Sequence, residues 1–329
     1  MAGPAFAAKR AKRLLSVTAM LGIGALLAVQ TEINGELATR LGSGLRAGTA
    51  AGLISFGTGL LFLSLLVTFE PRTRRGLQRI GTAVRSGDLR WWQVVGGVAG
   101  ACIVVSQGLT VGTIGVAFFT VALVAGLSSS SLLVDHVGLG PTGRQAISPV
   151  RVGGAALTLA AVLLTGAERL GGSDALGPAA LALGLLPMAA GGGAAYQQAV
   201  NGMVNQVGGP WAATWNNFLV GTTLLVVLML ASLGLPGDLR TLPGSWWLYT
   251  GGLMGVVFIS AAAVLVQVHG VLVLGLCTVA GQVICAVGID ALADEAHVGV
   301  LSVVGASLAL AGVAVASSTG LLRRHQLTR

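Results

Sequence analysis

The sequence predicts an all-α integral membrane protein of ten transmembrane helices, arranged as two inverted five-helix repeats. The first observation is composition: 54% of the residues are hydrophobic and only 9% are charged, whereas a soluble domain carries about a quarter charged residues. The second is an internal repeat, because the segment from Trp91 to Asp135 recurs 155 residues later without a gap, with 12 of 45 positions identical. The third is that links rich in arginine in one half correspond to links poor in arginine in the other.

Apolar stretches long enough to cross a bilayer, which takes about 20 residues each, occur five times in each half. Because backbone groups that face lipid must be hydrogen-bonded within their own segment, we expect helices. Residues 1–170 should form the first repeat and residues 171–329 the second, and together they should make one membrane domain. The predicted spans, in order, are 14–31, 47–69, 92–112, 114–134, 150–167, 176–199, 211–234, 246–268, 270–292 and 298–320.

The repeat is marked by polar and aromatic residues as well as by hydropathy. Gln30-x-x-x-Asn34-Gly35 returns as Gln197-x-x-x-Asn201-Gly202. Other landmarks return 155 residues later: Trp91-Trp92, Gly96, Gly97, Gly100, Ala125-Gly126 and Asp135 return as Trp246-Trp247, Gly251, Gly252, Gly255, Ala280-Gly281 and Asp290. A duplicated hydrophobic unit is typical of transporters that hold their site between two repeats.

The arginines and lysines predict the orientation. If the N-terminus is cytoplasmic and the spans alternate, 15 basic residues fall in cytoplasmic segments and 4 outside, in agreement with the positive-inside rule. Since each half has five spans, the second half enters from the opposite side, and both termini should be cytoplasmic. The external four are Arg40, Arg46, Arg169 and Arg240; the cytoplasmic set is Lys9, Arg10, Lys12, Arg13, Arg72, Arg74, Arg75, Arg79, Arg85, Arg90, Arg144, Arg151, Arg323, Arg324 and Arg329.

These motifs resemble the YdcZ-like branch of the drug/metabolite transporter (DMT) superfamily. The resemblance rests on the Gln-Asn first helix, Gly42-Ser43, Ser55-Phe56 with Gly59, the Trp-Trp-x-x-x-Gly-Gly segments and the apolar helices that end in Asp135 and Asp290. It covers about residues 15–320 and implies an EamA-like ten-helix fold. This chain departs from the pattern in two places. The family glutamine is present in the second half as Gln282 but is replaced by Leu127 in the first, and the Ser-Phe of the first half is Asn217-Phe218 in the second.

The resemblance and the repeat together favour a secondary transporter of a small organic solute or metabolite in the cytoplasmic (inner) membrane. It would work by alternating access, with export as the family-based direction and proton or cation coupling left open. The rival hypothesis is a non-transporting scaffold or accessory subunit. We expect no enzymatic activity, cofactor or metal, and no nucleic-acid partner. The partners should be the bilayer and a solute, with the chain a monomer or homodimer.

The amides on the first helix of each repeat are the main site candidates. Gln30 and Asn34 lie one helical turn apart, as do Gln197 and Asn201, and Asn205 extends the second face, with Gln198 beside it. In an inverted pair these faces can meet and offer hydrogen-bond donors and acceptors to a solute. The alternative is hydrogen bonding between helices. Gln282 joins the set through the family pattern.

Glu32 is the candidate for proton coupling. A charged group at mid-membrane costs about 2.5–3.5 kcal/mol on insertion scales, so it should face a cavity, and burial would favour a protonated carboxyl that a coupling proton could use. The alternative places Glu32 at the external interface, paired with Arg40 or Arg46. Only one repeat supplies this charge, because Ala199 occupies the equivalent position.

Two further features are open between a site and a structural role. Trp215 and Asn217, with Asn216 between them, could line the cavity or anchor the seventh helix at the interface. The run 191–193 of three glycines, preceded by Pro187, favours a break in the sixth helix where backbone lines a cavity. Its alternative is tight helix packing, the role that we expect for Gly96-x-x-x-Gly100 and Gly251-x-x-x-Gly255.

Overall fold

The computed structural model describes residues 4–170, 182–235, 237–292 and 300–326. Helices make up nearly all of this part of the chain, as predicted. The elements are α1 (Pro4–Leu41), α2 (Gly44–Phe69), α3 (Pro71–Ser86), η1 (Trp91–Val94), α4 (Gly97–Val137), α5 (Pro149–Leu170), α7 (Leu185–Gly208), α8 (Pro210–Ser232), η2 (Trp246–Tyr249), α9 (Gly251–Leu292) and α10 (Val300–Gln326).

Within the described residues, five helical segments are long and apolar enough to cross a membrane. They are Leu14–Leu41, Gly44–Phe69, Phe119–Val137, Pro210–Ser232 and Trp246–Cys285. Shorter apolar helices cover Gly97–Gln107, Pro149–Leu164 and Val303–Ala316. The prediction of an all-α membrane protein is therefore confirmed.

Helix α9 consists of two helices joined at Gly270, which has φ 79° and ψ 173°. A residue with a side chain rarely adopts this conformation, so glycine permits the change of direction. The break lies at the predicted boundary between spans 246–268 and 270–292. In α4, by contrast, helix continues from Gly97 to Val137, so the boundary predicted near residue 113 does not coincide with a helix end.

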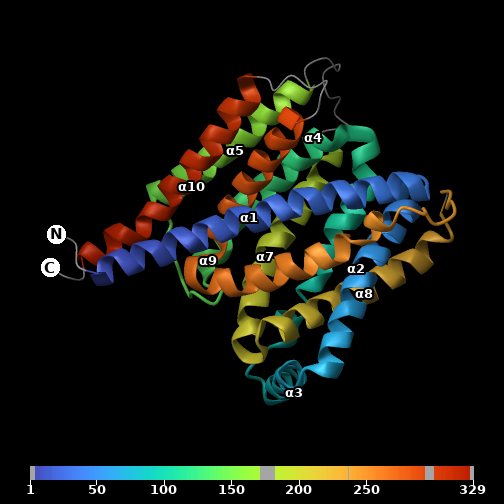
Figure 1. Cartoon of the computed structure of the whole chain (residues 1–329), viewed down its shortest axis with the longest axis horizontal. Coiled ribbons are helices and arrows are strands. Elements are labelled where there is room, and N and C mark those ends of the chain that lie inside the picture. Colours follow the sequence, from blue (N-terminus) through green and yellow to red (C-terminus); the bar gives the residue numbers. More distant parts are fainter. Residues whose placement is uncertain (1–3, 171–181, 236, 293–299, 327–329) are drawn as a thin grey trace.

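The helices pack in pairs that follow the sequence repeat. Helix α1 packs along α9 and α7 packs along α4, while α2 contacts α8 and α5 contacts α10. Figure 1 shows the blue α1 running beside the orange α9, and the red α10 beside the green α5. The largest apolar cluster combines residues of α1, α4, α5, α7, α9 and α10, including Met20, Val124, Ala161, Ala195 and Leu274. Some of its residues, among them Val124, also line a cavity between these helices.

The predicted break at the triple glycine is wrong. Helix α7 runs without interruption from Leu185 to Gly208, and Pro187 lies in its first turn, where the missing N–H has no intrahelical partner to lose. Gly191 lies directly against the backbone of Leu123 and Leu127 in α4, where a Cβ would overlap it. The glycine therefore permits close helix packing, which was the alternative hypothesis.

The basic link between the second and third predicted spans contains the amphipathic helix α3. Its inner side, with Thr73, Gly76, Ile80 and Ala83, is buried, and Gly76 packs against Gly208 and Ala212 at the junction of α7 and α8. The arginines on the other side are exposed: Arg72, Arg74, Arg75, Arg79 and Arg85.

Candidate functional site

A cavity of about 130 Å³ lies among α1, α4, α7 and α9. All four helices belong to the tightly packed pairs described above, so both halves of the chain enclose the same space. The residues that line it are Leu27, Thr31, Ile103, Leu123, Val124, Leu127, Ala194, Gln197, Gln198, Asn201, Phe258, Ile259, Ala262, Ala263, Thr278, Val279 and Gln282.

Most of these lining residues are equivalent in the sequence repeat. On the first helix of each repeat the spacing is 167 residues, as from Gln30 to Gln197, and on α4 and α9 it is 155. The pairs that both line the cavity are Leu27 with Ala194, Thr31 with Gln198, Ile103 with Phe258, Leu123 with Thr278, Val124 with Val279 and Leu127 with Gln282. The cavity therefore lies where equivalent surfaces of the two halves meet.

The amides of Gln197 and Asn201 are held in place by Asn217 of α8. Gln197 Nε2 and Asn201 Nδ2 donate to Asn217 Oδ1 over 2.9 and 3.0 Å. Asn217 is fully buried and does not line the cavity, so it positions two residues that do. The i, i+4 spacing of Gln197 and Asn201 on α7 lets one acceptor receive both bonds.

Gln198 lines the cavity and carries a buried, unpaired oxygen. The residue is 8% exposed, and within the described residues its Oε1 atom has no hydrogen-bond partner. Leaving a buried acceptor unsatisfied costs about 1–3 kcal/mol, and such atoms are rare in native structures. Because this atom has no accessible surface in the structure, a bound solute could donate to it only after the amide turned toward the cavity.

Gln30 and Asn34 do not line this cavity. They point toward the start of α9, where a Cβ on Gly255 would lie 2.8 Å from Gln30 Nε2 and one on Gly251 would overlap Asn34 Oδ1. Gln197 and Asn201 lie against Gly100 and Gly96 in the same way. Gln30 Oε1 and Asn34 Oδ1 are buried and have no hydrogen-bond partner in the described part of the chain.

Glu32 is exposed and lies outside the residues that line the cavity. Among the described residues neither alternative partner is paired with Glu32: Arg40 Nε binds Glu36 Oε1 over 2.7 Å, and Arg46 donates to the carbonyl oxygens of Ser232, Leu233 and Leu235. A role of Glu32 in proton coupling stays a prediction.

Asn205 and Trp215 are used for helix packing. Asn205 Nδ2 donates to the carbonyl oxygen of Ala263 over 2.7 Å, and Trp215 Nε1 donates to Ser64 Oγ over 3.1 Å. The cavity-lining part of the predicted set is thus Gln197, Gln198, Asn201 and Gln282. Whether these residues bind a solute stays a prediction.

Two threonines of the cavity wall were missed by the sequence analysis. Thr31 Oγ1 donates to the carbonyl oxygen of Leu27, and Thr278 Oγ1 to that of Gly275, each over 2.8 Å. Two signals could have found them. Thr31 is the repeat equivalent of Gln198, and Thr278 lies one turn before Gln282 on the same helix face.

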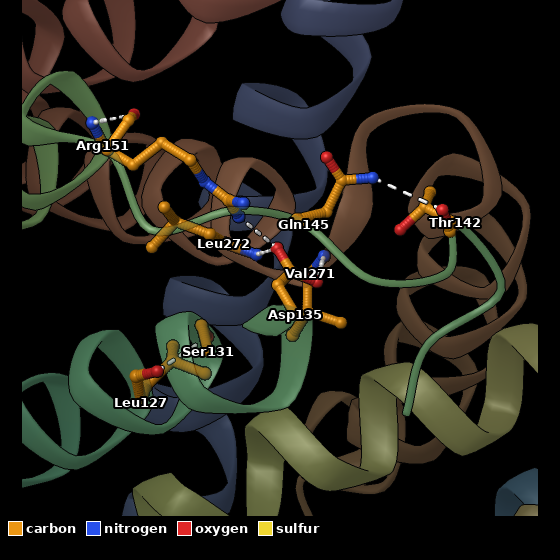
Figure 2. A network of polar contacts seen from close by, with 9 residues as sticks. Leu127, Ser131, Asp135, Thr142, Gln145, Arg151, Val271 and Leu272 are labelled. Carbon is orange, nitrogen blue, oxygen red and sulfur yellow. Dashed lines mark hydrogen bonds and ion pairs between the residues drawn. The ribbon is translucent and has the colours of Figure 1, made fainter. Parts of the chain in front are cut away.

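A buried ion pair fixes the break in α9 beside the cavity helices. Asp135, at the end of α4, is fully buried and pairs with Arg151 of α5. Its Oδ1 and Oδ2 accept the backbone N–H groups of Val271 and Leu272 over 3.0 and 3.1 Å. Figure 2 shows the carboxylate at the centre of these contacts. A carboxylate at this position caps the helix that starts after Gly270 and complements its dipole.

Comparison with known proteins gives a family and a fold. The profile of the DMT_YdcZ family, described as "Putative inner membrane exporter, YdcZ", matches residues 15–164 and 182–315. A solved chain described as "Crystal structure of protein" superposes with a TM-score of 0.64 at 17% identity, covering 95% of this chain and 97% of that chain. No curated protein matches. The structural likeness concerns the fold alone.

Proposed function

Because this chain belongs to the YdcZ family of inner membrane exporters, we propose that it is a secondary transporter that exports a small organic solute by alternating access. The observation that carries the proposal is the cavity between α1, α4, α7 and α9, which equivalent positions of the two halves line together. In transporters built from repeats, the substrate site lies at the interface of the repeats. The four helices around the cavity would rock against each other to open it to one side at a time.

The architecture proposed with it is ten spans in two inverted repeats, residues 1–170 and 171–329. The pairing of α1 with α9 and of α7 with α4 supports it. Helix α7 is the repeat equivalent of α1, and α9 is the equivalent of α4, so exchanging the repeats turns one helix pair into the other. In Figure 1 the start of α1 and the end of α10 lie at the same side of the molecule. This placement agrees with two termini on one side of the membrane, which the positive-inside rule assigns to the cytoplasm.

The orientation predicts a labelling pattern for intact cells. In a variant whose three native cysteines are replaced, Arg79→Cys should not react with an impermeant thiol reagent added outside, because α3 is cytoplasmic. Its matched control is Arg240→Cys, also exposed and assigned to the outside, which should react. If only Arg79→Cys reacts, the orientation is the reverse of the one proposed. If both variants react, the two positions are not on opposite sides and the proposed topology is rejected.

Filling the cavity tests the transport function. Ala194 lines the cavity from α7, and Ala194→Phe should occupy space that the solute needs. Ala156→Phe, at an exposed position of α5, is the control for added bulk. Cells that produce the native chain should release at least one small organic solute faster than cells with Ala194→Phe, measured by mass spectrometry of the medium, and Ala156→Phe should match the native chain.

Identical media from all three strains, with equal protein in the membrane, would instead favour the scaffold hypothesis. A scaffold needs no space for solute, so filling the cavity should leave its activity unchanged.

Proton coupling through Glu32 is the finer proposal, and it can be measured in the same cells. Glu32 follows Thr31, which lines the cavity, and lies about 100° further round α1, so coupling would require α1 to turn or shift during the cycle. Glu32→Gln keeps the shape and removes the titration. Release by the native chain should stop when a protonophore collapses the proton gradient, and release by Glu32→Gln should be slow and insensitive to it. Equal sensitivity of both would exclude Glu32 from coupling.

A further inference from the structure

We infer that the solute is uncharged and amphipathic, with an N–H or O–H donor at one end and a small apolar group at the other. This inference rests on the proposed transport function, because it assigns the ligand of the same cavity. Three observations carry it: the division of the wall into polar and apolar sides, the absence of charge, and the hydrogen-bonding state of the polar groups.

The polar groups come mainly from the second half of the chain. At two pairs of equivalent positions the first half supplies leucine and the second half supplies a polar residue. Leu123 is equivalent to Thr278, and Leu127 is equivalent to Gln282. With Gln197, Gln198 and Asn201 these residues form a polar wall on α7 and the second part of α9. The remaining wall is aliphatic apart from Phe258 and Thr31. Such a cavity complements a molecule with one polar end.

Among the described residues that line the cavity there is no Asp, Glu, Lys, Arg or His. An ion that leaves water for such a site loses its hydration and finds no opposite charge, and the cost is large. The nearest acid along the lining helices, Glu32, is exposed and lies outside the cavity. An uncharged solute avoids this cost.

The polar groups offer acceptors. The hydroxyl hydrogens of Thr31 and Thr278 are donated to backbone carbonyl groups, so only their oxygens remain for a ligand. Gln198 Oε1 is an unpaired acceptor, and one N–H of Gln197 and of Asn201 is already donated to Asn217. A ligand that donates hydrogen bonds can use these oxygens. The second N–H of each amide remains available to an acceptor, so a carboxylate is disfavoured by the cost of burying its charge and not by its hydrogen-bonding capacity.

The size of the cavity sets a limit on the solute. Pockets for drug-sized ligands have volumes of about 300–1,000 Å³, and this one has about 130 Å³. The ligand class is therefore a primary amide, lactam or alcohol with a short apolar chain.

Four probes of nearly the same shape test the inference on the purified full-length protein in detergent. Isovaleramide is uncharged and donates through its N–H groups, 4-methylpentan-2-one has a methyl group in place of the NH2 group and lacks the donors, isovalerate is an anion and isopentylammonium is a cation. The readout is the shift of the unfolding temperature with probe concentration, because a ligand of the native state stabilises it by mass action. Binding is measured without transport, so it can fail or succeed independently of the export experiment.

Isovaleramide should stabilise the protein, and the other three probes should bind about tenfold more weakly or not at all. Gln198→Leu should weaken binding of isovaleramide about tenfold, the size expected for one lost hydrogen bond, and Gln282→Leu is a second variant on the opposite helix. Gln267→Leu is the matched control, because Gln267 is an α9 glutamine outside the cavity whose Nε2 bonds to backbone. Equal or tighter binding of either ion, equal binding of the ketone, or no shift with isovaleramide would overturn the inference.

Discussion

Asp135→Asn should lower the free energy of unfolding by about 3–5 kcal/mol, the range for breaking one partner of a buried ion pair. The carboxylate is fully buried and Arg151 nearly so, with side chains 0% and 10% exposed. Asparagine keeps the size but removes the charge, so the guanidinium of Arg151 stays buried without a counterion. It can also present only one oxygen, where Asp135 uses two to cap Val271 and Leu272.

Thermal unfolding in detergent, followed by circular dichroism, measures this effect. The exposed pair of Glu36 and Arg40, with side chains 41% and 42% exposed, is the matched control, and Glu36→Gln should change stability by less than about 1 kcal/mol. The double variant Asp135→Asn with Arg151→Gln should be more stable than Asp135→Asn alone, because it removes the unpaired charge. A single variant as stable as the native chain would mean that the pair is solvated.

The same contacts explain which parts of the fold the sequence could predict. The apolar spans and the break at Gly270 follow from local rules, because lipid requires regular helices and a glycine permits the left-handed turn. The sequence also marks Asp135 as a repeat landmark. It cannot show that this carboxylate caps α9, because Val271 lies 136 residues away and only packing brings it there.

The cavity was predicted in part for similar reasons. Gln197, Gln198 and Asn201 stand out because amides are unusual in an apolar helix, whereas Thr31 and Thr278 do not, because threonine hydroxyls in membrane helices commonly bond to their own backbone. The misread glycine run has another cause. Glycine lowers helix stability and also allows close helix contact, and only the neighbouring helix, here α4 at Gly191, decides between the two.

Close contact also underlies the second large effect, which concerns Gly126→Val and Gly281→Val. Gly126 of α4 lies against the backbone carbonyl of Met188 in α7, and Gly281 of α9 lies against that of Leu21 in α1. The glycines are 155 residues apart and their contacts 167 apart, so the two sites are equivalent in the repeat. At each site a Cβ would overlap a backbone oxygen, which cannot rotate away as a side chain could, and the helices must separate.

Each valine should therefore lower the free energy of unfolding by about 1–3 kcal/mol or more, the range typical of overpacking. The effect should be similar at the two sites. The measurement is again the unfolding temperature in detergent. Gly57→Val in α2 and Gly22→Val in α1 are the controls, since a Cβ at either position meets nothing within 4 Å, and both variants should resemble the native chain. A large effect at only one of the two sites would mean that α4 against α7 and α9 against α1 are not equivalent. That result would reject the proposed symmetry of the two halves around the cavity, however tightly each helix pair is packed.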